Sequence, residues 1–117
     1  MAEGNIPKYM SGEDSGWLTT NSSAITGNVE YRKIGNVVQI VLEGIALTST
    51  LTSSYVLIAT IPVGYRPSKG YKFPLAPFND FGMVGVFENG SVYIYKYGTD
   101  IPAGHLLYGG SMYLTNA

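Results

Sequence analysis

The sequence lacks cysteine entirely and contains a single histidine, His105. Without cysteine the chain has no disulfide framework and no cysteine-based metal site, and one histidine is too few for a histidine-based site. A G-x-S-x-G nucleophile motif, a phosphate-binding loop, a dinucleotide fingerprint and an EF-hand loop are also missing. Asp80, Glu88 and Asp100 supply carboxylates, but at no spacing that identifies a catalytic pair. We therefore expect a protein that is not an enzyme and needs no cofactor.

Charge is scarce as well. Charged residues make up 13% of the chain, against about 25% in ordinary soluble domains. The net charge is -1, so the sequence has no basic patch for a nucleic acid or an anionic membrane surface. No apolar run approaches the roughly 18 residues of a membrane span, and residues 1–10 lack the pattern of a signal peptide. We expect no nucleic-acid partner and no insertion into a membrane.

In place of charge the sequence has 10 Tyr, 15 Gly and many Ser, Thr and Asn residues. A tyrosine-rich, sparsely charged surface suits a subunit interface or a sugar-binding face, and an ordinary uncharged β surface is the alternative. The chain is long enough for one domain with its own core. Residues 1–15 show no periodicity and are expected to be a linker or the end of a preceding shaft. A β domain then covers residues 16–117, with Trp17 expected in its core.

The chain is organised around a predicted hairpin over residues 28–44. Gly35-Asn36 is expected to form its type II′ turn, because Gly readily takes the positive φ that the first central position requires. The second arm, residues 37–42, is apolar apart from Gln39. That pattern predicts a strand covered on both faces.

A second hairpin is predicted at Glu88-Asn89-Gly90-Ser91, because Asn-Gly between apolar runs indicates a type I′ turn. A two-residue loop pairs Phe87 with Val92. One face of the hairpin is then expected in the core, and it carries Met83, Gly85, Phe87, Val92 and Ile94. The other face is expected to pack against another subunit or a ligand, and it carries Val84, Val86, Tyr93 and Tyr95. A second layer of the same chain is the alternative cover for this face.

The remaining segments also favour strands. Residues 55–61 predict a buried strand, residues 71–76 an edge strand broken by Pro74, and residues 108–114 a last strand bulged at its glycines. Residues 45–54 fit a loop or a ragged edge strand. About eight short strands and no helix predict an all-β fold, a compact antiparallel β-sandwich or jelly-roll-like barrel.

A stiff loop over residues 62–67 precedes the edge strand. Gly64 can take positive φ there, and Arg66 is expected to hydrogen-bond loop carbonyls or a nearby carboxylate, with a ligand contact as the alternative. The residues assigned to turns and loop geometry are Gly35, Asn36, Gly64, Arg66, Asn89 and Gly90.

Several short motifs occur together from Gly16 onward. They are Gly16-Trp17, the run YRKIGNVV (31–38), the run IPVGYRP (61–67), Asn89-Gly90-x-Val92-x-Ile94 and Met112-Tyr113-Leu114. In this order and spacing they resemble the C-terminal head domains of phage and prophage tail-fibre and baseplate proteins. The resemblance implies a compact β domain of a virion tail, usually a homotrimer. It implies binding to host cell-wall polysaccharide or teichoic acid, or docking to another tail or baseplate protein.

The resemblance transfers no binding residue, so the candidate site residues rest on chemistry. Sugar sites combine aromatic faces with hydrogen-bonding carboxylate, amide or imidazole groups. The residues that supply these groups in local clusters are Asn79, Asp80, Tyr93, Tyr95, Tyr97, Asp100 and His105. Three hypotheses follow: a receptor-binding head, a structural adaptor of the same fold, and a monomeric carbohydrate-binding module.

Overall fold

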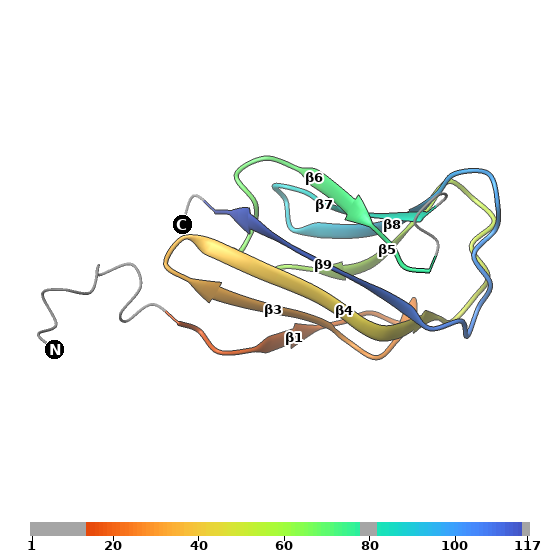
Figure 1. Ribbon diagram of the computed structural model, residues 1–117, viewed down its shortest axis with the longest axis horizontal. Helices are drawn as coiled ribbons and strands as arrows, with labels where there is room; N and C mark the ends of the chain where they lie inside the picture. The colour runs from red at the N-terminus through yellow and green to blue at the C-terminus, as the bar shows by residue number, and fades with distance from the viewer. Residues whose placement is uncertain (1–13, 78–81, 116–117) are drawn as a thin grey trace, which may run out of the picture.

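The computed structural model describes residues 14–77 and 82–115. Within these ranges the fold is all-β, as predicted, and nine strands form two antiparallel sheets packed as a β-sandwich (Figure 1). The strands are β1 (Leu18–Thr20), β2 (Ile25–Thr26), β3 (Val29–Ile34), β4 (Val37–Leu47), β5 (Tyr55–Thr60), β6 (Tyr71–Pro74), β7 (Gly82–Val86), β8 (Ser91–Lys96) and β9 (Leu107–Leu114). None of the described residues belongs to a helix that could span a membrane.

The predicted central hairpin is confirmed as β3 and β4. Ile34 faces Val37 across the turn, Gly35 has φ +62° and Asn36 has a negative φ, as a type II′ turn requires. β4 also pairs with β9, and its far end pairs with β2. The hairpin is therefore the centre of the five-stranded sheet, with β1 added at the edge beside β3.

β4 differs from its prediction in two ways. It continues to Leu47, because a bulge at Gly44 shifts the register between Glu43 and Ile45 and carries the strand on to β2. The sequence predicts a bulge at Gly109-Gly110 of β9, but the bulge lies on its partner strand, β4.

The prediction that this strand is covered on both faces is also wrong for the single chain. Val38 and Ile40 are fully buried, whereas Val37 and Gln39 are exposed. The physical reason is that a two-layer sandwich leaves the outer face of each sheet without a third layer.

The four-stranded sheet has the order β5-β8-β7-β6, and β6 is the edge strand that Pro74 predicts. The predicted β7–β8 register is wrong by one residue. Phe87 N–H donates to Ser91 O at 3.0 Å, and Gly90 N–H donates to Phe87 O at 2.8 Å. The loop therefore has three residues and ends in Gly90 at φ +88°, whereas a type I′ turn would need positive φ at Asn89 too.

This shift exchanges the faces of one strand, because successive side chains point to opposite sides of a sheet. Val84 pairs with Ile94 and Val86 with Val92, and all four are fully buried. Phe87, predicted in the core, lies instead toward the outer face with Tyr93 and Tyr95, which are only partly exposed.

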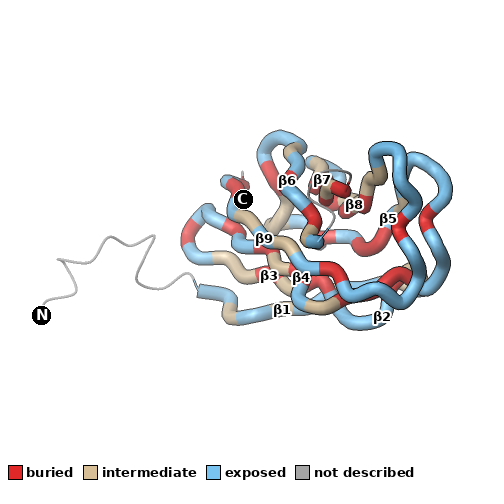
Figure 2. The backbone as a smooth tube through the Cα atoms, turned by 45° about the vertical axis from the view of Figure 1, so that its right-hand side comes forward, coloured by how far each residue is buried: buried red, intermediate tan, exposed pale blue. Residues whose placement is uncertain are grey.

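The core lies between the two sheets, where the buried residues of the strands gather (Figure 2). Hydrogen bonds join the two sheets along both sides of the sandwich. On one side Ala76 bridges to Tyr108, and Tyr71 Oη donates to Met112 O at 2.7 Å. On the other side Ser22 Oγ donates to Ile58 O at 2.8 Å. These bonds cover edge strands that would otherwise be open to pairing with other chains. The largest fully buried side chains include those of Ile40, Leu42, Ile45, Ile58, Ile61, Leu75, Ile94, Ile101 and Leu107.

Trp17 is not in the core; it is 46% exposed, with the Arg32 guanidinium 5.8 Å from its ring centroid. Arg32 also forms an ion pair with Asp14, and this pairing lowers the pKa of the Asp14 carboxyl to about 2. Ser15 N–H donates to Lys33 O at 2.9 Å. Asp14 and Ser15, which the sequence assigns to the linker, therefore contact the sheet.

Candidate ligand-binding face

Aromatic side chains gather on the outer face of the four-stranded sheet. The register places Tyr55 opposite Tyr95 and Leu57 opposite Tyr93. Because alternate residues share a face, this surface collects side chains from all four strands. We call it the tyrosine face; its members are Tyr55, Leu57, Lys72, Met83, Gly85, Phe87, Tyr93 and Tyr95.

The rings of the tyrosine face contact one another. Tyr55 and Phe87 both meet Tyr93 edge-on, and their ring centroids lie 5.3 and 5.8 Å from that of Tyr93. The ring centroid of Tyr95 lies 6.0 Å from that of Tyr93. These are the spacings of favourable aromatic pairs. Tyr55 is 55% exposed and Leu57 is 43% exposed, so the cluster is open to solvent. Exposed apolar patches are often found at interaction sites.

Two glycines let the rings lie close to the sheet. A Cβ atom on Gly85 would lie 2.8 Å from Tyr95 Cε2 and 3.0 Å from Phe87 Cε2. A Cβ atom on Gly70 would lie 2.6 Å from Phe87 Cδ1. The absence of these side chains allows Phe87 and Tyr95 to pack over backbone, which holds the aromatic surface in one arrangement.

A single cation belongs to the face. Lys72 Nζ lies 4.3 Å from the centroid of the Tyr95 ring and donates a long hydrogen bond of 3.4 Å to Tyr97 Oη. A cation over an aromatic ring is attracted by the negative face of the π system. Burial raises the pKa of the Tyr95 hydroxyl, and the Lys72 charge partly opposes that shift.

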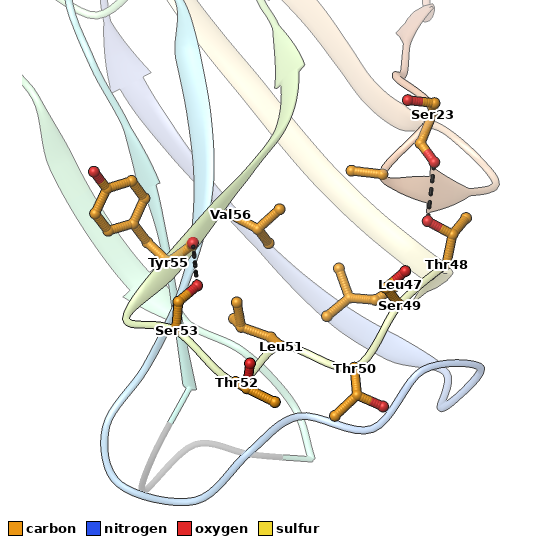
Figure 3. A pocket seen from close by; sticks show the side chains of 11 residues that line it. Ser23, Leu47, Thr48, Ser49, Thr50, Leu51, Thr52, Ser53, Tyr55 and Val56 are labelled. Carbon is orange, nitrogen blue, oxygen red and sulfur yellow. Dashed lines mark hydrogen bonds between the residues drawn. The ribbon is translucent and has the colours of Figure 1, made fainter.

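A pocket of about 340 Å³ lies at the end of the sandwich where the loop between β4 and β5 passes (Figure 3). Leu47, Leu51 and Val56 point toward a shared space, and Tyr55 extends on the other side of β5. The lining has no charged side chain, and its hydroxyl groups come from Ser23, Thr48, Ser49, Thr50, Thr52, Ser53 and Tyr55.

Part of this hydroxyl-rich rim is ordered by internal hydrogen bonds. Thr48 Oγ1 donates to Ser23 O at 2.9 Å, and Ala103 N–H donates to Thr50 Oγ1 at 3.1 Å. A neutral hydroxyl rim beside an aromatic surface has the chemistry to contact a polar, uncharged group of a ligand.

The structure brings some of the predicted site residues together on the tyrosine face and places others elsewhere. Tyr93 and Tyr95 lie together on the tyrosine face, and Tyr97 lies beside it through Lys72. Asp100 forms an ion pair with Lys96, with 3.1 Å between Oδ1 and Nζ.

Asp100 and His105 are both exposed in the connection between β8 and β9. That connection lies beside the β4–β5 loop, because Leu51 of the loop forms an antiparallel bridge with Ile101. Asn79 and Asp80 lie outside the described residues.

Sequence reasoning assigned Met83, Gly85 and Phe87 to the core and gave no site role to three other members of the face, Tyr55, Leu57 and Lys72. Tyr55 and Leu57 stand in the run YVLIATI, in which Thr60 alone interrupts the apolar residues and no alternation reveals which side faces water. Lys72 lies between two aromatic residues of β6, and its alternation with Tyr71 and Phe73 is the one signal that could have indicated an outward position.

Arg66 has the loop role expected of it. Its Nε donates to Ile61 O at 2.7 Å, which ties the 62–67 loop to the strand before it. No cluster of three or more potential metal ligands occurs among the described residues. Comparison with models of protein families and with curated proteins found no match to this chain.

Proposed function

We propose that this protein is a non-enzymatic head domain of a phage tail fibre or baseplate, which binds saccharide on the host cell surface. The observation that supports a binding role is the exposed tyrosine face with the hydroxyl-rimmed pocket at its Tyr55 end. Aromatic surfaces cover the apolar C–H side of a pyranose ring, and hydroxyl groups exchange hydrogen bonds with the sugar hydroxyls. The phage-tail assignment rests on the motif resemblance.

Several copies on one particle would strengthen weak binding. Linked sites raise the overall affinity well above that of a single site, provided that they reach the ligand together. A small, open saccharide site is therefore consistent with a domain displayed in several copies at the end of a fibre.

We expect Tyr93→Ala to weaken binding to cell-wall polysaccharide by about tenfold, which corresponds to about 1.4 kcal/mol. Tyr93 is the ring that contacts both Tyr55 and Phe87, so its removal breaks up the aromatic surface. Binding would be measured by biolayer interferometry on a panel of purified cell-wall polysaccharides from Gram-positive bacteria.

The matched control is Tyr108→Ala, because Tyr108 is 44% exposed on the outer face of the other sheet. The control should bind as the unmodified protein does. Equal losses in both variants, or full binding by Tyr93→Ala, would contradict the proposed use of the tyrosine face.

A second observation favours a protein-contacting role, as in a homotrimer or a structural adaptor that docks another tail protein. Ile34, Val37 and Leu114 form one row across β3, β4 and β9, and they are 38%, 37% and 59% exposed. Met112, 64% exposed, stands in the next row beside Gln39. Exposed aliphatic side chains grouped in this way fit a subunit interface, and we propose a homotrimer that closes over this aliphatic row.

Light scattering after size exclusion should give about three times the chain mass of 12.6 kDa. Leu114→Glu should reduce the mass to that of one chain, because it places a carboxylate in the aliphatic row. Leu106→Glu is the control, since Leu106 is also exposed (53%) but lies in the β8–β9 connection. A monomeric unmodified protein would contradict trimerisation through the aliphatic row; it would leave either a preceding shaft that does the trimerising or a monomeric carbohydrate-binding module.

A further inference from the structure

Lys72 is the one charged member of the tyrosine face. The strand β6 places it opposite Gly85 at the edge of the sheet, and its Nζ lies over the Tyr95 ring. The other side chains that point outward from β5, β7 and β8 are Tyr55, Leu57, Met83, Tyr93 and Tyr95. None of these carries a charge at neutral pH.

No carboxylate among the described residues forms an ion pair with Lys72. The two ion pairs found there join Arg32 to Asp14 and Lys96 to Asp100. Glu88, the acidic residue of the β7–β8 hairpin, has its Oε1 beside Gly70. The positive charge of Lys72 therefore lies on an aromatic surface, and no carboxylate of the described residues neutralises it.

The ammonium is also held in position. The Tyr95 ring and the Tyr97 hydroxyl fix one side of it, and an ammonium has three donors, so donors remain for a ligand. A group that is ordered before binding loses less conformational entropy when the ligand arrives. This arrangement suits recognition of an anion next to a ring-shaped apolar group.

We infer that Lys72 makes the tyrosine face selective for saccharides that carry a negative charge, either a carboxylate or a phosphate. The inference rests on the proposed function. The sugar ring packs on Tyr55 and Tyr93, and the acidic substituent pairs with Lys72 Nζ. Lys72 is thus a specificity-determining residue, and the tyrosines supply the general affinity for saccharide.

The test uses the full chain and three immobilised polysaccharides: polygalacturonate, which carries carboxylates, phosphomannan, which carries phosphates, and neutral dextran. Lys72→Met removes the charge and keeps an unbranched apolar side chain, while Lys72→Arg keeps the charge. Lys69→Met is the matched control, because Lys69 is exposed in the connection before β6 and is not part of the face. Affinities are measured at low and high sodium chloride, and circular dichroism checks folding of each variant.

Lys72→Met should weaken binding to at least one acidic polymer by about tenfold and leave binding to dextran unchanged. Lys72→Arg and Lys69→Met should bind as the unmodified protein does. High salt should weaken the unmodified protein and leave Lys72→Met unaffected, because salt screens exposed charge pairs. Comparing polygalacturonate with phosphomannan identifies which anion is preferred.

Four results would overturn the inference. Equal losses in Lys72→Met and Lys69→Met would assign the effect to net charge, and equal losses on acidic and neutral polymers would assign Lys72 to holding Tyr95. Binding of dextran as tightly as the acidic polymers would remove the charge selectivity while the saccharide-binding function stands. Absence of binding to all three polymers and to the cell-wall panel would remove both proposals.

Discussion

Gly90→Ala is expected to destabilise the domain by about 4 kcal/mol, because two separate penalties fall on one methyl group. Gly90 has φ +88°, a conformation that costs an L-residue about 1–2 kcal/mol. A Cβ atom there would also overlap the Ile61 carbonyl oxygen and lie 2.6 Å from Arg66 Nε. That carbonyl accepts from Arg66, and Ile61 N–H donates to Gly90 O at 2.7 Å, so relief of the clash would break hydrogen bonds.

Gly98→Ala separates the two penalties. Gly98 has a similar φ of +98°, but nothing lies within 4 Å of its ideal Cβ position. We expect a loss of about 1–2 kcal/mol there, from backbone strain alone. Urea unfolding of both variants measures the difference. Equal losses at the two positions would show that the contact between Gly90, Ile61 and Arg66 does not constrain the hairpin.

The same contact explains why one hairpin was predicted well and the other was not. At Gly35-Asn36 the turn geometry depends on two neighbouring residues, so local sequence was enough to give turn type and register. At Asn89-Gly90 the turn is packed against Ile61 and Arg66, which lie far away in the sequence. Local signals located that turn, but long-range packing chose its length.

The candidate site was predictable only in part, for a related reason. Tyr93 and Tyr95 alternate with Val92 and Ile94, and this period of two placed the tyrosines on one face. The strand YVLIAT has no such alternation, so Tyr55 and Leu57 could not be assigned to the outside. Their exposure follows from the two-layer architecture, which leaves apolar residues of a sheet facing outward with no layer over them.

Val84→Asp and Met83→Asp test the register of β7 directly. The sequence prediction puts Met83 in the core and Val84 on the other face, and the structure has the reverse. Val84 is fully buried opposite Ile94, whereas Met83 points outward and is only partly buried. Val84→Asp loses the burial of a valine, about 1.5–3 kcal/mol, and places a carboxyl group in the core without a partner. We expect a total loss of about 4 kcal/mol or more, a large fraction of the stability of a domain of this size.

Met83→Asp should cost about 1 kcal/mol, because its carboxylate can reach water from the outer face. Thermal and urea unfolding of the two variants would be compared under the same conditions. A two-residue loop at Asn89-Gly90 would reverse the order, since Met83 would then face the core and Val84 the solvent. The sign of the difference between the two variants therefore decides the register, and with it which side chains of β7 stand beside Tyr93 and Tyr95 on the tyrosine face.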